Sequence, residues 1–299
     1  MATKGVKSRI ASVKNIQKIT RAMEMVAAAR LRKAEQRVEQ LRDYAGAVRR
    51  MTRQAAEAAG NIPNVPLLSE RESENTVGIL LFTGDRGLAG AFNSQIVRAG
   101  VRAAAELQGQ GRDIVWFAVG RRGVSSLRFR GNDPEGAFEG FTDRPSYADA
   151  REIASDLIAA YVDGKVDRVD LFYNRYVSAM SQTVTRETLL PLQQATILEA
   201  MEQAAEEQPD SGHSALVEYE PEPDAILERL VPAYVEISVF RALLESTASE
   251  HGARMTAMRN ASENASEVIS DLTLQMNRER QAEITQEIME VVAGAESLV

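Results

Sequence analysis

Three glycines recur at three-residue steps in the segment "GDRGLAGAFN", residues 84–93. The segment follows an apolar run and precedes a helical pattern, which is where loops that cradle phosphate groups occur. A Walker loop ends in Gly-Lys-Ser or Gly-Lys-Thr, however, and no lysine follows Gly90; the dinucleotide fingerprint G-x-G-x-x-G is absent too. We therefore expect Gly84, Gly87 and Gly90 to shape a tight turn, and keep a small phosphate-handling enzyme as an alternative.

Other residues suited to catalysis are few. The two histidines, His213 and His251, lie in an acidic stretch and in a helical pattern, without metal-ligand spacing. The serines of "RRGVSSLRF", residues 121–129, have no obvious base nearby. There is no cysteine, which excludes disulfides and thiol catalysis. We predict no catalytic residue, no metal and no cofactor.

Composition favours long helices. Aromatic residues make up 5% of the 299 residues, which favours Ala, Leu and Met cores over a β-rich body. The net charge of −8 argues against general nucleic-acid binding. No apolar run approaches the roughly 18 residues that span a bilayer. The basic N-terminus lacks the apolar core of a secretory signal, and its helical pattern continues through Glu24 and Glu35, so we interpret it as mature protein.

Charge is distributed unevenly along the chain. Residues 1–53 hold 14 Lys or Arg against four acids, whereas the segment from Arg241 to the end holds five arginines against ten acids. The two ends are therefore electrically complementary, which favours their association.

A heptad pattern covers the N-terminal segment. Eleven of fifteen positions are apolar along this series: Val6, Ile10, Val13, Gln17, Thr20, Glu24, Ala27, Leu31, Ala34, Val38, Leu41, Ala45, Val48, Thr52 and Ala55. As one helix these residues form a rod of roughly 80 Å, so part of it must project from any compact domain. Near Gln17, Thr20 and Glu24 the apolar set shifts by one. It becomes Ile16, Ile19, Met23 and Val26, and we predict that the seam changes face there.

The C-terminal segment predicts a matching helix. After Pro232 the pattern opens at Val235, and its later apolar positions are Met255, Met258, Ala261, Ala265, Ile269, Leu272 and Met276. The polar stretch "NRERQAE", residues 277–283, interrupts it, and Ile284, Ile288 and Val291 resume it. Two long helices of opposite charge at opposite ends of a chain most simply form an antiparallel coiled coil.

The middle of the chain alternates between strand and helix patterns. Strands are predicted over 75–85, 113–120 and 166–174, a weaker one over 182–190, and helices over 92–107 and 146–162. The predicted fold class is a mixed α+β and α/β protein, in which a long antiparallel coiled coil carries at its base a Rossmann-like α/β domain with a largely parallel sheet. The predicted domains are an N-terminal helix (1–60), the α/β domain (75–195), an acidic connector (199–224) and a C-terminal helix (225–299).

Five segments carry a resemblance to a known family. They are "KSRIASVKNIQKITRAMEMVAAARLRKA" (7–34), "TGDRGLAGAFN" (83–93), "YVSAMSQ" (176–182), "YEPEP" (219–223) and the long stretch from "STASEHGARMTAMRN" to "EVVAGA" (246–295). In this order, over nearly the whole chain, they resemble the gamma-subunit family of F-type ATP synthase. The resemblance implies a non-catalytic rotor shaft, whose coiled coil enters the ring of alpha and beta subunits and whose base sits with the epsilon subunit on the membrane c-ring. Proton flow turns such a shaft, and ATP forms on the beta subunits.

The same resemblance implies a location and two sets of contacts. The location is the cytoplasmic face of a bacterial energy-coupling membrane, held through the complex. Contacts to the beta subunits would come from Lys18, Arg21, Met23, Arg30, Arg254, Arg280, Gln281, Thr285 and Glu287, and contacts to the rotor ring or epsilon from Tyr44, Tyr219 and Glu220. Exposed ion pairs are individually weak, so such contacts break and reform as a shaft turns. Ala89 stands where the family often has cysteine, and the regulatory cysteine pair of plastid relatives is absent. A structural coiled-coil adaptor remains the second alternative.

Overall fold

The computed structural model describes residues 2–59, 67, 71, 73–192 and 223–296. These form two compact units, one of Met1–Ala28 with Arg254–Val299 and one of Ala29–Ala253, which are described separately. Two long helices, α1 (Ala2–Ala59) and α6 (Pro223–Glu296), each contribute to both units. The predicted connector, apart from its last two residues, lies outside the described residues, as do Tyr219 and Glu220.

The second unit contains a five-stranded sheet in the order β3-β2-β1-β4-β5. Its strands are β1 (Thr76–Phe82), β2 (Asp113–Val119), β3 (Gly136–Phe138), β4 (Arg168–Ser178) and β5 (Ser181–Leu190). The first four run parallel, and β5 returns antiparallel to β4 through a hairpin. The prediction of a largely parallel sheet is thus confirmed. Strand β3 was not predicted, because it has only three residues.

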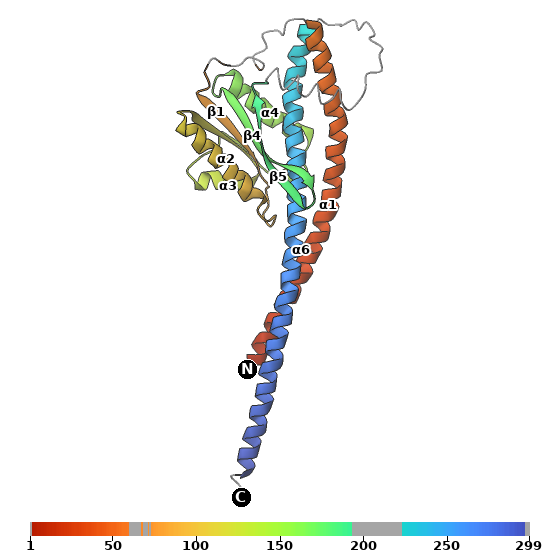
Figure 1. The fold of residues 1–299 in the computed structure, drawn as a ribbon, viewed down its shortest axis with the longest axis vertical. Helices are drawn as coiled ribbons and strands as arrows, with labels where there is room; N and C mark the ends of the chain where they lie inside the picture. The colour runs from red at the N-terminus through yellow and green to blue at the C-terminus, as the bar shows by residue number, and fades with distance from the viewer. Residues whose placement is uncertain (1, 60–66, 68–70, 72, 193–222, 297–299) are drawn as a thin grey trace. The chain divides into compact units, whose positions relative to one another are not determined.

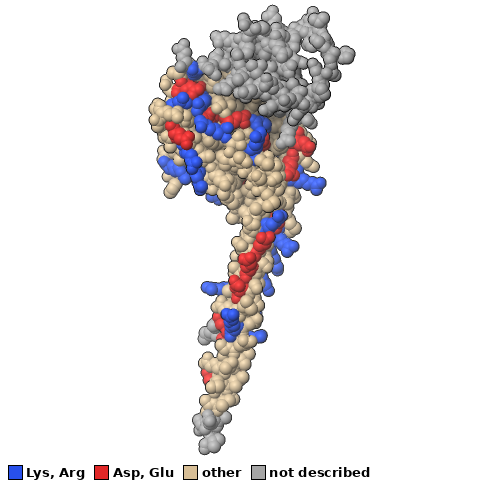
Figure 2. Space-filling view, in the orientation of Figure 1, with Lys and Arg blue, Asp and Glu red and all other residues tan. Residues whose placement is uncertain are grey.

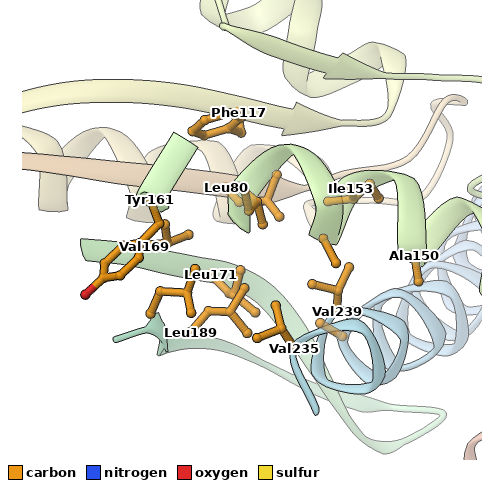
Figure 3. Close-up of a cluster of buried hydrophobic side chains, with 14 of the residues drawn as sticks. Leu80, Phe117, Ala150, Ile153, Tyr161, Val169, Leu171, Leu189, Val235 and Val239 are labelled. Carbon is orange, nitrogen blue, oxygen red and sulfur yellow. The ribbon is translucent and has the colours of Figure 1, made fainter. Parts of the chain in front are cut away.

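The sheet is covered on both faces, which explains its continuous apolar strands. Along β1, Val77, Ile79 and Leu81 pack with α2 (Phe92–Gly109) and α3 (Arg121–Phe129). The alternate residues, Leu80 and Phe82, pack with α4 (Tyr147–Val162) and with α6. Figure 3 shows side chains of this second face converging from β1, α4 and α6.

Local signals account for two helix features. Ser146 caps the N-terminus of α4: its hydroxyl accepts the Asp149 N–H while the Asp149 carboxylate accepts the Ser146 N–H, a capping box. Helix α6 begins at Pro223 and includes Pro232, so Pro232 neither starts nor ends it. In the second unit α6 covers the sheet with Val231, Val235 and Val239.

In the first unit, α1 and α6 pack antiparallel, with Gln17 Nε2 3.5 Å from Ser262 O and Arg259 Nε 2.9 Å from Glu24 Oε1. The predicted change of face is wrong. Thr20 is buried in the seam and its hydroxyl bonds Gln17 O at 3.1 Å, whereas Ile16 and Ile19 are 53% and 59% exposed. Polar residues stay in this seam because each one finds a hydrogen-bond or ionic partner there.

Helix α6 extends beyond the start of α1 within this unit (Figure 1). Because residue numbers run in opposite directions along an antiparallel pair, these contacts bring Ala2 level with about residue 279. The apolar positions Ile284, Ile288 and Val291 are therefore exposed and form no resumed seam with α1, contrary to expectation. Figure 2 shows few charged side chains on the visible side of this last part of α6.

No helix among the described residues has both the length and the apolar content needed to cross a lipid bilayer.

Candidate functional site at the carboxyl edge of the sheet

The strand order reverses at β1, because β2 and β3 lie on one side of it and β4 and β5 on the other. In doubly wound sheets, ligands bind outside the carboxyl ends of the strands at such a point. Helix α6 occupies this place instead. Its side chains leave a cavity of about 10 Å³ beside Thr83, Thr142 and Glu250, about the space of one water molecule.

Three hydroxyl groups of α6 bond backbone carbonyls at this edge. The Ser246 hydroxyl donates to Phe82 O at 3.4 Å, at the end of β1, and Ser249 donates to Asn174 O at 2.9 Å, on β4. The Thr247 hydroxyl shares its hydrogen between Thr142 O at 3.0 Å and Leu243 O at 2.8 Å in its own helix. The helix thus supplies hydrogen-bond donors to backbone carbonyls of β1, β4 and the loop after β3.

The glycine-rich turn allows this close packing. A Cβ at Gly84 would lie 2.6 Å from the Glu250 carboxyl group, so a larger residue there would have to displace that side chain. Leu88 and Gly90 both have positive φ, at 62° and 55°, as the predicted tight turn implies. A phosphate group here would also meet the carboxylates of Asp85 and Glu250, which would repel it. In the described part of the chain α6 thus fills the side of the turn that Gly84 faces, which disfavours a phosphate site there.

Asp85 connects this turn to the loop after β3. Its Oδ2 accepts the N–H groups of Gly140 at 3.0 Å and Thr142 at 3.2 Å and the Thr142 hydroxyl at 2.9 Å, and its Oδ1 accepts the Arg121 N–H at 3.0 Å. Burial alone would raise the pKa of Asp85, but the hydrogen bonds from Gly140, Arg121 and Thr142 outweigh it and hold the pKa below 3.8. The ionised carboxylate therefore fixes residues 140–142.

The next residue of that loop, Asp143, contacts both long helices. Its carboxylate pairs with Arg30 of α1 at 2.5 Å and lies 3.8 Å from His251 Nε2 of α6. Arg86, from the glycine-rich turn, lies 3.8 Å from the same carboxylate. One side chain thus joins four segments of the second unit.

The β4–β5 hairpin also bonds both helices. The Tyr176 hydroxyl donates to the Glu35 carboxylate on α1. Burial, together with the hydrogen bond to Glu35, raises the pKa of Tyr176, so the phenol stays protonated and remains a donor. On α6, Gly252 lies so near the hairpin that a Cβ there would be 3.1 Å from Ala179 O.

The predicted partner contacts fall into three groups. Lys18 and Arg21 are exposed, Met23 is half-buried, and the C-terminal set is exposed on the last part of α6: Arg280, Gln281, Thr285 and Glu287. Arg30 is paired with Asp143, and Arg254 is only 8% exposed. The side chain of Tyr44 lies outside the described residues, like Tyr219 and Glu220.

The contacts of Asp85, Asp143, Tyr176 and the hydroxyls of α6 were not predicted from the sequence. One signal was present: "STASEHG", residues 246–252, gathers small and hydroxyl side chains within a long helix, as close packing on polar backbone requires. No group of three or more His, Asp or Glu side chains in the described part of the chain is placed to hold a metal ion.

Comparison with known proteins identifies the family. The family model described as "ATP synthase" matches residues 2–298. The gamma chain of Rubrobacter xylanophilus ATP synthase is 43% identical over 293 residues, covering 98% of this chain and 97% of that one. This chain belongs to the ATP synthase gamma chain family. The gamma chain of Acidiphilium cryptum is 42% identical and covers 99% of both chains.

Solved structures of mitochondrial ATP synthases contain chains with a similar fold. A chain of the Tetrahymena thermophila mitochondrial ATP synthase, from a structure titled "central stalk/cring", is 29% identical with a TM-score of 0.59, covering 82% of this chain and 99% of that one. A chain of the Euglena gracilis mitochondrial ATP synthase has a TM-score of 0.67 at 18% identity, covering 99% of this chain and 94% of that one. The likeness to the Euglena chain supports the gamma-chain fold alone.

Proposed function

We propose that this chain is the central rotor shaft of a membrane-bound F-type ATP synthase, which couples proton flow through the c-ring to ATP synthesis or hydrolysis. The observation that carries the proposal is the gamma-chain match over 98% of the sequence, which includes both long helices and the α/β domain. In this role the chain is not itself catalytic. It holds the catalytic beta subunits in different conformations, through contact energies that differ between rotational states.

The exposed end of α6 supports this role. From about residue 279 onward it has no α1 residue beside it, and Ile284, Ile288 and Val291 are exposed. Exposed apolar side chains on an unpaired helix suit insertion into a surrounding protein ring. We infer that Arg280, Gln281, Thr285 and Glu287 contact beta subunits from this segment.

The basic face of α1 supplies the second proposed contact. Lys18 and Arg21 are exposed beside Ile16 and Ile19, so charge and apolar surface are both available to the ring. Met23 is half-buried among them. Arg30 keeps 32% of its side chain exposed while it pairs with Asp143, so it can contact a beta subunit without leaving that pair. Arg254 is only 8% exposed and joins this contact only by exchanging its surroundings within the chain for a beta subunit.

For the opposite end we propose contacts to the epsilon subunit and the c-ring through Tyr44, Tyr219 and Glu220. The Tetrahymena structure, whose title joins central stalk and c-ring, supports such a neighbour. The bacterial relatives support a location on the cytoplasmic face of the energy-coupling membrane, held there by the complex. The adaptor alternative would not account for a gamma-chain match through the α/β domain as well as the helices.

The decisive experiment is reconstitution with the alpha and beta subunits of the same organism. The three proteins should form an ATP-hydrolysing complex that rotates a bead attached to this chain. The sequence has no cysteine, so Phe129→Cys, at a side chain that is 89% exposed, gives a single attachment point. Association without rotation would favour the adaptor, and failure to associate would contradict the proposed function.

A further inference from the structure

Two parts of the α/β domain hold the two long helices, and each part contacts both. The loop arm, residues 140–143, contacts α1 at Arg30 and α6 at Thr247 and His251. The hairpin arm, residues 174–182, contacts α1 at Glu35 and α6 at Ser249 and Gly252. All of these residues belong to the second compact unit.

The arms approach each helix from different sides. A helix turns about 100° per residue, so Arg30 and Glu35 point in directions about 140° apart around α1. On α6, Thr247 and His251 lie about 40° apart on one side, and Ser249 and Gly252 lie about 60° apart on another. The mean directions of these two pairs differ by about 150°. A helix held from one side can roll against its support, whereas one held from nearly opposite sides cannot.

The contacts on α6 are shielded from water. Ser249, His251 and Thr247 are all buried, and Gly252 is buried as well. Hydrogen bonds and ion pairs in such surroundings are stronger and more directional than at an exposed surface. The loop arm is itself fixed from behind, because Asp85 accepts two of its backbone N–H groups and the Thr142 hydroxyl.

The position of the arms along the helices is also informative. The boundary between the two compact units falls between Ala28 and Ala29 on α1 and between Ala253 and Arg254 on α6. Arg30 and His251 therefore lie within three residues of that boundary. The loop arm therefore contacts both helices close to the end of the second unit.

We propose that the two arms together form a rotational lock, which prevents α1 and α6 from rolling against the α/β domain when torque passes along them. Asp143 and Tyr176 are its positioning residues. The inference rests on the proposed function, because only a rotating shaft loads these contacts in torsion. The lock implies that torque applied to the helices reaches the sheet through the loop arm and the hairpin arm at the same time.

Variants that release one arm at a time test the lock in the assembled complex. The loop-arm variant combines Asp143→Ala with Thr247→Val, and the hairpin-arm variant combines Tyr176→Phe with Ser249→Ala. The control is Asp133→Ala, because this carboxylate is 82% exposed and its ion pair in the described part of the chain is with Arg128 of the same domain. Spin labels at Phe129→Cys on α3 and Arg37→Cys on α1 report motion between domain and helix by pulsed EPR.

Each arm variant should broaden the distance distribution, with a variance up to about twofold that of the unaltered complex, because one of the two arms is released while α6 still packs on the sheet through Val231, Val235 and Val239. ATP hydrolysis without load should stay unchanged, while ATP synthesis driven by a proton gradient should fall. A simple loss of stability would lower the melting temperature without broadening the distribution in the folded complex. If a variant does not assemble, the same labels are measured in the isolated full-length chain, where the same broadening is expected.

Unchanged widths in both arm variants, or equal broadening in the control, would overturn the lock. A failure of the proposed function looks different. In that case the unaltered chain would not support ATP-driven rotation at all, whereas a rotating complex with unchanged widths refutes the lock alone.

Discussion

Replacing Asp85 by asparagine isolates the contribution of one carboxylate to the loop arm. The substitution keeps the size of the side chain and removes its charge and one acceptor oxygen. Asp85 Oδ2 receives three donors and Oδ1 receives the Arg121 N–H. Asparagine therefore keeps most bonds by turning its oxygen toward the three donors, which places its NH₂ group against the Arg121 N–H.

The expected loss of unfolding free energy follows from these bonds. A hydrogen bond to a charged group contributes about 1.5–3 kcal/mol and a neutral one about 0.5–1.5 kcal/mol, so one bond is lost and three are weakened. At the centres of these ranges, one lost bond and three weakened bonds sum to about 6 kcal/mol for fully buried, independent bonds. Because Asp85 is only partly shielded from water, we expect a loss of about 2 kcal/mol for Asp85→Asn.

Urea unfolding followed by tryptophan fluorescence measures this loss. Trp116 is the only tryptophan and is buried in β2, so its emission reports the α/β domain. The matched control is Asp133→Asn, an exposed carboxylate whose loss should change stability by less than about 0.5 kcal/mol. An effect of Asp85→Asn as small as that of the control would refute the assigned role of this carboxylate.

The pH dependence gives a second check on Asp85. Its folded pKa lies below the ordinary value of 3.8, so the unfolded chain takes up this proton first as pH falls. The stability from the carboxylate is therefore complete above 3.8 and is lost as pH falls through the lower, folded pKa. The difference between wild type and Asp85→Asn should be constant from pH 7 to about 5 and shrink below 3.8. A difference that grows on acidification would contradict the sign.

Four further changes have defined outcomes. Gly252→Val should lower the free energy of unfolding, measured with urea, by about 1–3 kcal/mol, because a side chain there meets the hairpin backbone. The control Gly109→Ala, at a glycine where an added Cβ would meet nothing within 4 Å, should not lower it. Leu157→Ala, at a fully buried core position, should lower it by about 2–5 kcal/mol, and a smaller loss would show that the core adjusts there. Met23→Lys should lower the ATP yield per transported proton while the complex still assembles, and an unchanged yield would count against the contact. Truncation after Val292 should preserve more ATP-driven proton pumping than truncation before Gln275, which removes α6 residues level with the start of α1; equal losses would contradict the register.

Periodicity predicted the long helices and the parallel strands, since both are repeated local patterns of burial. It was wrong about the seam near Gln17 and Thr20 because it assumed that apolar residues face the partner helix. Ile16 and Ile19 are exposed on the isolated chain, and Thr20 is buried. A count of apolar residues cannot distinguish a surface buried by the same chain from one that another protein covers.

The contacts of the loop arm and the hairpin arm with the helices could not be predicted from the sequence, for a different reason. Arg30 and Asp143 are 113 residues apart, and Asp85 and Thr142 are 57 apart. No periodic pattern relates such positions, since their meeting depends on the whole sheet topology. The strand β3 was missed because three residues are too few to show alternation.

The two long helices lie at opposite ends of the sequence, and this has a consequence for the synthesis of the chain. Helix α1 leaves the ribosome first, yet the contact between Gln17 and Ser262 joins residues 245 positions apart. Until almost the whole polypeptide has been made, the apolar stripe of α1 has no α6 to pack against. The backbone carbonyls that Ser246 and Ser249 bond also remain without these donors. Such late closure leaves a nascent chain open to misassociation, so its biogenesis should depend on chaperones that shield the first helix until the last one arrives.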